Sequence, residues 1–429
     1  MIARLVLLLA SITAFASATY AQTAAPDDGV PAFLGQIQRS LEAHDDQALR
    51  ALIDPAAADD QVAGFVEDLV TPDIQRAVIN ERDRVALENV PAGDGYRLII
   101  EIFVETARRA RILTSLIDVR RVPQASGNPW RITATQGLTS VEGLNRLRVN
   151  GERQFAARNL SISADDMKLT LAEGTVFQID AQDGVTGLVL IGRGEMRFTP
   201  AAATEKGQLR IFAGSDSLAA AFDTAYVRLN PFDYEQRVTT ASLTPVPVNP
   251  RLLRRAQDIF AREGPRSFNL DLSELSADQW YLLPSPGDLL AEVHTRKYDT
   301  LTYTRSGAQV EDITLFDREH RRTISVYSSP SHIAASAVFN EDDVKEYDVL
   351  DYNIAATVSP ERQFIDGLVR MRLRVQATQL TALTFRLADG LNVTAVGTME
   401  YGRLLPLRVR NQNSVIRSEE HTSELQSRF

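Results

Sequence analysis

The chain of 429 residues contains no cysteine. It can form no disulfide, so apolar cores have to hold its domains together. The same absence excludes cysteine nucleophiles and thiolate-bound zinc. Histidine is scarce too, with five residues in the whole chain. Any imidazole-based site is therefore confined to a few positions.

Long basic or apolar runs are also missing. The net charge is −10, and short arginine pairs such as 108–109 and 254–255 stand among apolar residues. Such pairs indicate the solvated sides of strands and of a helix, and no basic stripe suits a phosphate backbone, so we predict no nucleic-acid partner. Beyond the N-terminal leader, no apolar run approaches the ~20 residues that span a bilayer, so we predict no transmembrane segment.

The N-terminus predicts export. Residues 1–21 begin with one basic residue, Arg4, continue with an apolar run, and end in small residues at 16–18 and at Ala21. This is the order of a secretory signal peptide, with cleavage near Ala18 or Ala21. We therefore expect a bacterial protein that is exported, either periplasmic or secreted.

The C-terminus predicts a foreign tail. Residues 417–427 read Arg-Ser-Glu-Glu-His-Thr-Ser-Glu-Leu-Gln-Ser, which is similar to the translation of a short-read sequencing adaptor. We expect residues 417–429 to be an artefact with no part in the fold. The natural protein is then expected to continue past Ile416, and this chain is expected to be a fragment.

The composition predicts a globular chain of several domains. Hydrophobic residues make up 44% and charged residues 24% of the sequence, which is typical of packed proteins and not of disordered ones. Without the leader and the tail, about 395 residues remain, enough for about two to four domains.

Residues 30–148 are predicted to form an α+β domain. Helical spacing of apolar residues occurs three times, at 33–41, 48–53 and 62–69. Strand patterns follow at 84–90, 96–105, 111–122 and 130–135. Helices on one face of an antiparallel sheet make a compact α+β unit. The order of elements resembles the cone-shaped NTF2-like fold.

Residues 149–340 are predicted to form a β-rich antiparallel domain. Apolar and polar residues alternate along much of it, and turn signals such as Asp183-Gly184 separate the runs. One amphipathic helix is expected at 251–263, with Asn249 as its N-cap. We expect its apolar face to dock on a sheet, with partner binding as the alternative. The acidic segment 340–346 is expected to mark a boundary.

The cluster around His320 and the histidines at 44, 294 and 332 are the candidate sites, and each favours a structural interpretation. The cluster Asp317-Arg-Glu-His320 could serve acid–base or metal chemistry, but its place between two strand patterns favours a solvated turn. His294 has no second histidine at metal spacing and is expected on a strand surface. His44 precedes Asp45-Asp46 at a helix junction, where capping explains the group. His332 is expected in a loop.

Known catalytic motifs are absent from the sequence. Gly192-Arg-Gly194 follows a strand pattern but lacks the third glycine and the helix of a phosphate loop, so it is predicted to be a hairpin turn. No Gly-x-Ser-x-Gly, P-loop or His-Glu-x-x-His sequence occurs. We therefore predict no catalytic, cofactor-binding or metal-ligating residue in this chain.

The segment 347–416 carries the most specific pattern. It contains Tyr347-Asp-Val-Leu-Asp-Tyr-Asn-Ile-Ala-Ala-Thr-Val358 and Gln363-Phe-Ile-Asp-Gly-Leu-Val-Arg-Met-Arg-Leu-Arg-Val375. Apolar residues alternate along both stretches, and residues 363–375 should pair antiparallel with 353–358 across the turn at 359–362. These two strands resemble the opening of the N-terminal β-domain of M1-family zinc metallopeptidases, the aminopeptidase N and leukotriene A4 hydrolase group.

The resemblance implies a parent enzyme and no site in this chain. In that family the β-domain is a saddle that precedes a catalytic domain, where a His-Glu-x-x-His helix and a later glutamate hold zinc. No residue here matches those roles, so zinc and a peptide substrate are expected only of the parent, an aminopeptidase-type hydrolase. Residues 30–340 would then be an exported extension.

Two alternatives come from other classes of protein. A non-catalytic exported binding or scaffold protein built of β-modules also fits a motif-free, strand-rich sequence. A lipid carrier with a concave sheet would require a wide apolar cavity, which the sequence does not reveal.

Overall fold

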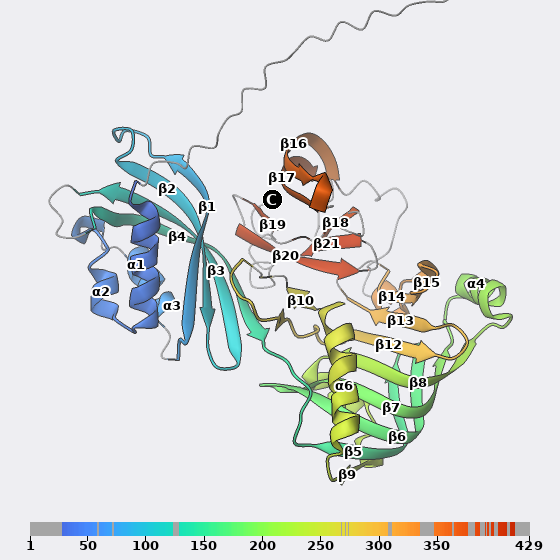
Figure 1. Ribbon diagram of the computed structural model, residues 1–429. Coiled ribbons are helices and arrows are strands. Elements are labelled where there is room, and N and C mark those ends of the chain that lie inside the picture. The colour runs from blue at the N-terminus through green and yellow to red at the C-terminus, as the bar shows by residue number, and fades with distance from the viewer. Residues whose placement is uncertain are drawn as a thin grey trace, which may run out of the picture.

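The chain folds mostly into antiparallel β-sheets in the computed structural model (Figure 1). This confirms the predicted fold class. The structure describes residues 28–57, 60–70, 73–122, 128–266, 268–270, 272, 274–307, 311–334, 347–362, 364–375, 382–386, 391, 393, 396–398, 402–409 and 412–416. The predicted signal peptide, the acidic segment 340–346 and the predicted foreign tail lie outside these residues.

Three helices cover one face of a six-stranded sheet (Figure 1). They are α1 (Val30–Glu42), α2 (Asp46–Arg50) and α3 (Asp60–Leu69), close to the predicted positions. The Asp45 side chain accepts a hydrogen bond from the backbone N–H of Ala48 at 2.8 Å, which confirms the predicted capping of the second helix. Apolar residues of all three helices share one core with Trp130 of the sheet.

The six-stranded sheet has the order β1-β2-β3-β4-β11-β10. Its strands are β1 (Arg76–Ala86), β2 (Gly95–Glu105), β3 (Arg109–Arg121), β4 (Trp130–Asn145), β10 (Asn269–Leu270) and β11 (Trp280–Tyr281). The structure places the strand predicted at 84–90 earlier in the chain, at Arg76–Ala86. Asn89 and Gly93 have φ of 61° and 88° and turn the chain back into β2, so the strand ends before them.

Strands β10 and β11 reach this sheet from far along the chain. Tyr281 pairs with Asn145 at the end of β4. The segment around them covers the sheet face opposite the helices, where the ring of Trp280 meets that of Phe103 edge-on at 5.8 Å. Part of the segment predicted for the second domain thus completes the first sheet.

A nine-stranded sheet forms the second unit, in the order β15-β14-β13-β12-β8-β7-β6-β5-β9. Its strands are β5 (Gln154–Ala164), β6 (Met167–Ala181), β7 (Gly184–Phe198), β8 (Leu218–Leu229), β9 (Leu243–Val246), β12 (Leu289–Thr295), β13 (Thr300–Arg305), β14 (Ile313–Asp317) and β15 (Arg322–Tyr327). The turn predicted at Asp183-Gly184 joins β6 to β7.

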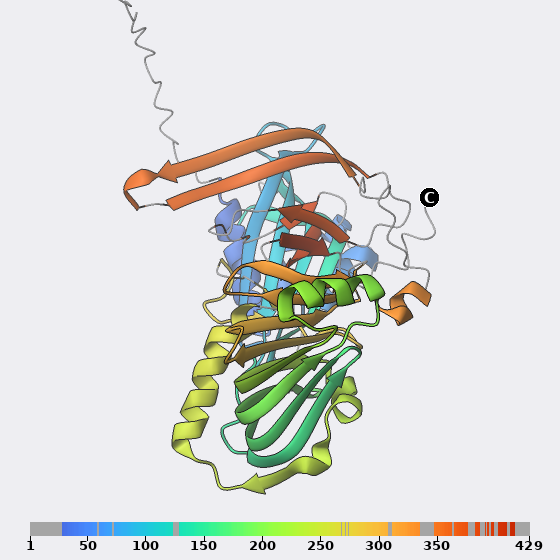
Figure 2. The same cartoon turned by 90° about the vertical axis from the view of Figure 1, so that its right-hand side faces the viewer.

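This sheet curls around its own core (Figure 2). The Tyr303 hydroxyl on β13 donates to the carbonyl of Ala164, at the end of β5, at 3.1 Å. The Tyr327 hydroxyl on β15 contacts the carboxylate of Asp166 in the β5–β6 turn. Strands from opposite parts of the sheet therefore meet, and apolar side chains fill the space that they enclose.

Helix α6 (Pro250–Glu263) packs on the other face of the nine-stranded sheet (Figure 1). The predicted N-cap is confirmed, since the Asn249 side chain accepts from the backbone N–H groups of Arg251 and Leu252. Ala256 and Ile259 are buried against the sheet. The helix therefore docks on a sheet, as predicted.

The buried Arg228 connects strand β8 of the nine-stranded sheet to the β10–β11 segment. Arg228 on β8 is fully buried and donates to the carbonyl of Leu282 at 2.9 Å. Its guanidinium lies over the rings of Phe268 and Tyr281, 5.4 and 5.8 Å from their centroids. These contacts link the two large sheets by cation–π attraction and a hydrogen bond.

The interpretation of Gly192-Arg-Gly194 as a hairpin turn is wrong. The three residues lie inside β7, where Gly192 pairs with Gly174 of β6 and the register toward β8 shifts between Ile191 and Gly194. Gly192 has φ of 152°. Glycine marks a bulge and a close approach of two backbones here, and not a chain reversal.

The predicted hairpin near residue 360 is present. Strand β16 (Tyr347–Ser359) pairs antiparallel with β17 (Phe364–Val375), from Ser359 opposite Phe364 to Tyr347 opposite Val375. A short turn at 360–362 joins them. In Figure 2 this two-stranded ribbon arches across the top of the view, above the other strands.

Short elements complete the described chain. A four-stranded sheet has the order β18-β21-β20-β19, with β18 (Ala382–Arg386), β19 (Val396–Thr398), β20 (Gly402–Val409) and β21 (Gln412–Ile416). The remaining helices are α4 (Ala203–Ala213), α5 (Tyr234–Arg237) and α7 (Pro330–Ala334). His332, expected in a loop, lies in α7.

Candidate functional site

The strongest polar cluster of the described residues lies where the end of α6 meets β12 and β14. Glu263, the last residue of α6, and Glu292 on β12 are 0% and 3% exposed. One nitrogen of Arg318, just after β14, lies 2.6 Å from Oε2 of Glu263 and 3.0 Å from Oε2 of Glu292. A single guanidinium thus bridges two buried carboxylates.

His294 and Thr302 extend this cluster along the sheet. The Nε2 atom of His294 lies 3.2 Å from Oε1 of Glu263, and its Nδ1 atom lies 2.9 Å from the Thr300 hydroxyl. The Thr302 hydroxyl donates to Oε2 of Glu292 at 2.6 Å. His294 is on a strand as predicted, but its ring is engaged on both sides.

The two carboxyl groups differ in acidity. Burial alone raises the pKa of Glu263, but hydrogen bonds from His294, Arg262 and Arg318 outweigh it and bring the pKa from 4.5 to about 2. Burial also raises the pKa of Glu292, and Arg318 and Thr302 offset only part of that rise. Glu263 is therefore firmly ionised, while Glu292 holds a proton more readily than an ordinary glutamate.

Two carboxyl groups with opposite pKa shifts are a pattern of acid–base sites. A catalytic pair also requires a hollow in which a substrate can reach both groups. Here the helix end and two strands enclose Glu263 and Glu292, and the Glu263 side chain is 0% exposed. The cluster is therefore best understood as a charged contact that holds the end of α6 on the sheet.

Glu263→Gln is expected to change how stability depends on pH. The folded-state pKa of Glu263 lies below its unfolded value, so its contribution is complete above pH 4.5 and is lost as pH falls toward 2. Urea unfolding of both proteins at several pH values should show the largest difference near pH 7 and a shrinking one below pH 4.5. A difference that stays constant across that window would contradict the assigned pKa.

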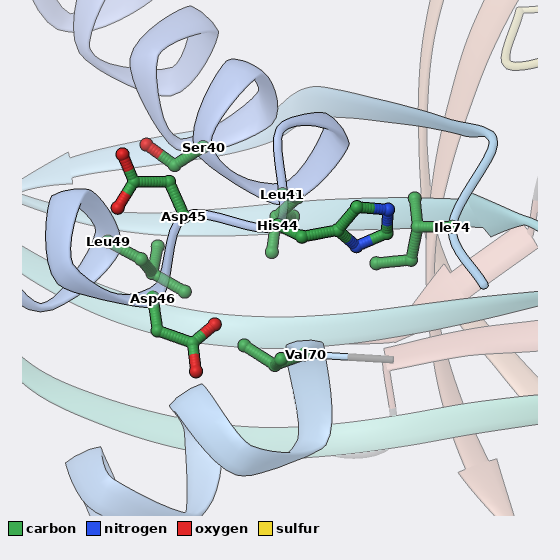
Figure 3. A pocket seen from close by; sticks show the side chains of 8 residues that line it. All are labelled: Ser40, Leu41, His44, Asp45, Asp46, Leu49, Val70 and Ile74. Atoms are coloured by element: carbon green, nitrogen blue, oxygen red, sulfur yellow. The ribbon is translucent and has the colours of Figure 1, made fainter. Parts of the chain in front are cut away.

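A small hollow beside the C-terminal ends of α1 and α3 and the start of α2 contains His44 (Figure 3). Ser40, Asp45 and Asp46 also line it, and it has no room for a water molecule. His44 itself adopts a positive φ of 53° in the turn between the helices. The group is thus explained by helix capping and chain reversal, and it offers no ligand site.

A second hollow of about 490 Å³ lies on the exposed side of β6 and β7. Lys168, Arg193 and Arg197 line it together with Glu195. The two arginines pair with Glu173 and Glu195 at 3.1 and 2.9 Å, and all four of these side chains are more than half exposed. This open surface lacks the buried polar groups of a binding site.

The cluster Asp317-Arg-Glu-His320 forms a turn, as predicted, but only half of it is solvated. Asp317 is 2% exposed and accepts from the backbone N–H of His320 at 3.1 Å. Arg318 turns inward to the two glutamates, while the His320 side chain remains 68% exposed. The predicted solvated turn is confirmed at His320, but it is wrong for Asp317 and Arg318, because distant carboxylates attract the arginine.

Sequence reasoning missed the cluster of Glu263, Glu292 and Arg318. Glu263 stands at the end of a helix whose other charges face solvent, and Glu292 interrupts the apolar strand Leu289–Thr295. A charged residue within an apolar strand was the one available signal, since buried carboxylates require a partner.

No described group of three or more His, Cys, Asp or Glu side chains is placed to hold a metal ion. Within the same residues, no helix has the length and apolar character needed to cross a membrane.

No model of a protein family, no curated protein and no solved structure matches this chain.

Proposed function

We propose that this chain is the non-catalytic N-terminal part of an exported M1-like zinc metallopeptidase. The resemblance rests on the segment 347–416, and the observation that carries the proposal is an uncovered apolar face on the β16–β17 hairpin. On one face, Ile354 lies opposite Val369 and Val358 lies opposite Ile365. These four side chains are 47–64% exposed.

The other face of the hairpin is mixed: it carries the exposed apolar side chains of Phe364 and Leu368 near the turn and charged pairs farther from it. Asp348 lies opposite Arg374, and Asp351 opposite Arg372. Opposite charges across two strands stabilise a solvent-facing surface. The ribbon is therefore more apolar on the side of Ile354 and Val369 and carries charge pairs only on the other side.

A two-stranded ribbon of this kind is at most marginally stable in water by itself. Its apolar side needs a covering layer, and exposed apolar patches mark interaction surfaces. A larger β-domain, of which β16 and β17 are the opening strands, would supply that layer. This is the arrangement that the M1 resemblance implies, with zinc and the peptide substrate bound only in the later catalytic domain.

The test begins with the gene as it stands in the source DNA, read through and beyond codon 416. We expect an in-frame His-Glu-x-x-His helix followed by a further glutamate. The chain 22–416 is expected to bind no stoichiometric zinc and to hydrolyse no aminoacyl amide, whereas the longer protein does both. An apolar fluorescent dye should bind the shorter chain more strongly, because the hairpin face is uncovered there.

A stop codon soon after codon 416 would contradict the proposal. Zinc or peptidase activity in the chain 22–416 would contradict its non-catalytic part. Equal dye binding by both lengths would show that the additional residues do not cover the hairpin.

A non-catalytic exported binding or scaffold protein is the second candidate. It is favoured by the filled interior of the nine-stranded sheet, where Phe198 and Tyr303 are both 0% exposed. The same packing disfavours a lipid carrier, because buried apolar side chains of β5–β8 and β12–β15 pack together inside the curled sheet. A gene that ends near codon 416 would make the scaffold the better answer.

A further inference from the structure

The outward side of α6 carries a concentration of positive charge. Arg251, Arg254 and Arg255 are all exposed on this helix. Its apolar residues, among them Ala256 and Ile259, are turned to the sheet. The helix also exposes Arg262 and one carboxylate, Asp258, and it keeps no large apolar side chain for the outside.

Within the described residues these three arginines lack carboxylate partners, as do other exposed arginines such as Arg158 and Arg370, but these three lie together on one helix. Arg97, Arg193 and Arg197 each have a carboxylate oxygen within 2.8 to 3.1 Å. Within the described part of the chain, no carboxylate lies at ion-pair distance from Arg251, Arg254 or Arg255. Their charge is therefore available to a partner.

The positive surface continues onto the neighbouring strand end. Arg296 and Lys297 follow β12 and are exposed. Arg296 pairs with Asp223 at 2.7 Å, and Arg255 adds to the lowering of the pKa of Asp223 by Arg296, so this carboxylate offsets part of the positive charge. We call Arg251, Arg254, Arg255, Arg296 and Lys297 the arginine face.

The sign of this face is opposite to that of the whole chain, whose net charge is −10. A negatively charged surface would repel most of the protein and attract this one side. A local positive patch on a protein of negative net charge favours one orientation of that protein on a negatively charged partner. The arginine face thus has the property of an orienting contact.

We propose that the arginine face binds the anionic headgroups of a lipid bilayer. Helix α6 has 14 residues, about 21 Å in length, and lies on the outside of the nine-stranded sheet (Figures 1 and 2). It is a convex ridge, and neither hollow described above lies on it. A folded protein partner requires a complementary shape, whereas mobile lipid phosphates adjust to a row of guanidinium groups.

This contact is peripheral, since the ridge has no apolar side chains to insert. Binding should therefore depend on the charge of the lipid and weaken with salt. The inference does not depend on the proposed peptidase parent.

The test uses the purified chain from residue 22 onward, which contains every described residue. Co-sedimentation is measured with vesicles of phosphatidylcholine alone and with vesicles containing 30% phosphatidylglycerol. We expect binding only to the second kind, and its loss at high salt. The triple substitution Arg251→Gln, Arg254→Gln, Arg255→Gln should weaken it on the order of 100-fold.

The matched control removes three cations elsewhere, with Lys168→Gln, Arg193→Gln and Arg197→Gln. These residues line the exposed hollow on β6 and β7. The control should bind anionic vesicles nearly as well as the original chain. A variant with lysine at 251, 254 and 255 should retain most of the binding. Circular dichroism and thermal unfolding verify that each variant is folded.

The proposal is overturned if the original chain does not bind anionic vesicles or binds neutral vesicles equally well. It is also overturned if both triple glutamine variants lose the same amount of vesicle binding. A fourth contrary result is binding of polyglutamate without binding of vesicles. The last result would assign the arginine face to an acidic protein instead.

Discussion

Arg318→Leu is expected to destabilise the nine-stranded unit by about 3–5 kcal/mol, because it leaves two buried carboxylates without their shared cation. Arg318 contacts Glu263 at 2.6 Å and Glu292 at 3.0 Å. Leucine restores some apolar contact but no charge. Both carboxyl groups must then lose their ionised form or draw water into the interface beneath α6.

The loss of stability in Arg318→Leu should be greater at high pH than at low pH. Without Arg318, the folded-state pKa values of both glutamates rise, so protonation relieves the unpaired charge. Urea unfolding should therefore show a larger deficit at pH 8 than at pH 5. Backbone amides in the last turn of α6 should also exchange hydrogen faster, because Arg318 no longer pairs with Glu263 at the end of this helix.

The matched control for this prediction is Arg193→Leu. Arg193 also pairs with a glutamate, but the two side chains are 78% and 65% exposed. Its loss should cost about 1 kcal/mol or less. An Arg318→Leu deficit as small as that of the control would show that the cluster is hydrated and does not hold α6 in place.

Gly192→Ala is expected to destabilise the same sheet by about 3 kcal/mol or more, through backbone strain and a steric clash. Gly192 has φ of 152°, and a Cβ atom there would lie 2.4 Å from the carbonyl oxygen of Glu173. The obstacle is backbone on the neighbouring strand, so no side-chain rotation can relieve it. Thermal and urea unfolding of the purified variant measure the effect.

Gly207→Ala provides the control. Gly207 lies within α4, and a Cβ atom there would meet nothing within 4 Å. Alanine should therefore raise stability by about 0.5–1 kcal/mol through its better helix propensity. Gly192→Ala with a stability equal to that of the original chain would mean that β6 and β7 can separate without cost at this bulge.

Much of the local structure could be predicted because its causes are local. The cap by Asn249 involves N–H groups two and three residues away. The period of apolar residues predicted α6 and its buried side, and a turn at 359–362 between two alternating runs predicted the β16–β17 pairing. In each case the groups that interact are close in the sequence, so the pattern contains the whole argument.

The candidate site could not be predicted, because its partners are distant in the sequence. Glu263 and Arg318 are separated by 55 residues, and Glu292 and Arg318 by 26. In the sequence, Arg318 resembles an ordinary turn residue. In the folded chain, the curled sheet places it next to the end of α6. The same reason explains Gly192, whose need for glycine comes from the facing backbone of Glu173.

The sequence by itself determined the β-rich character of this protein, its amphipathic helix and its last hairpin. These follow from periodicity, capping and turn chemistry within short windows. Only the tertiary structure decided that β10 and β11 complete the first sheet, that Arg318 joins two buried glutamates, and that one side of α6 concentrates unpaired arginines. Burial and charge pairing depend on which distant segments meet, and a linear pattern does not contain that information.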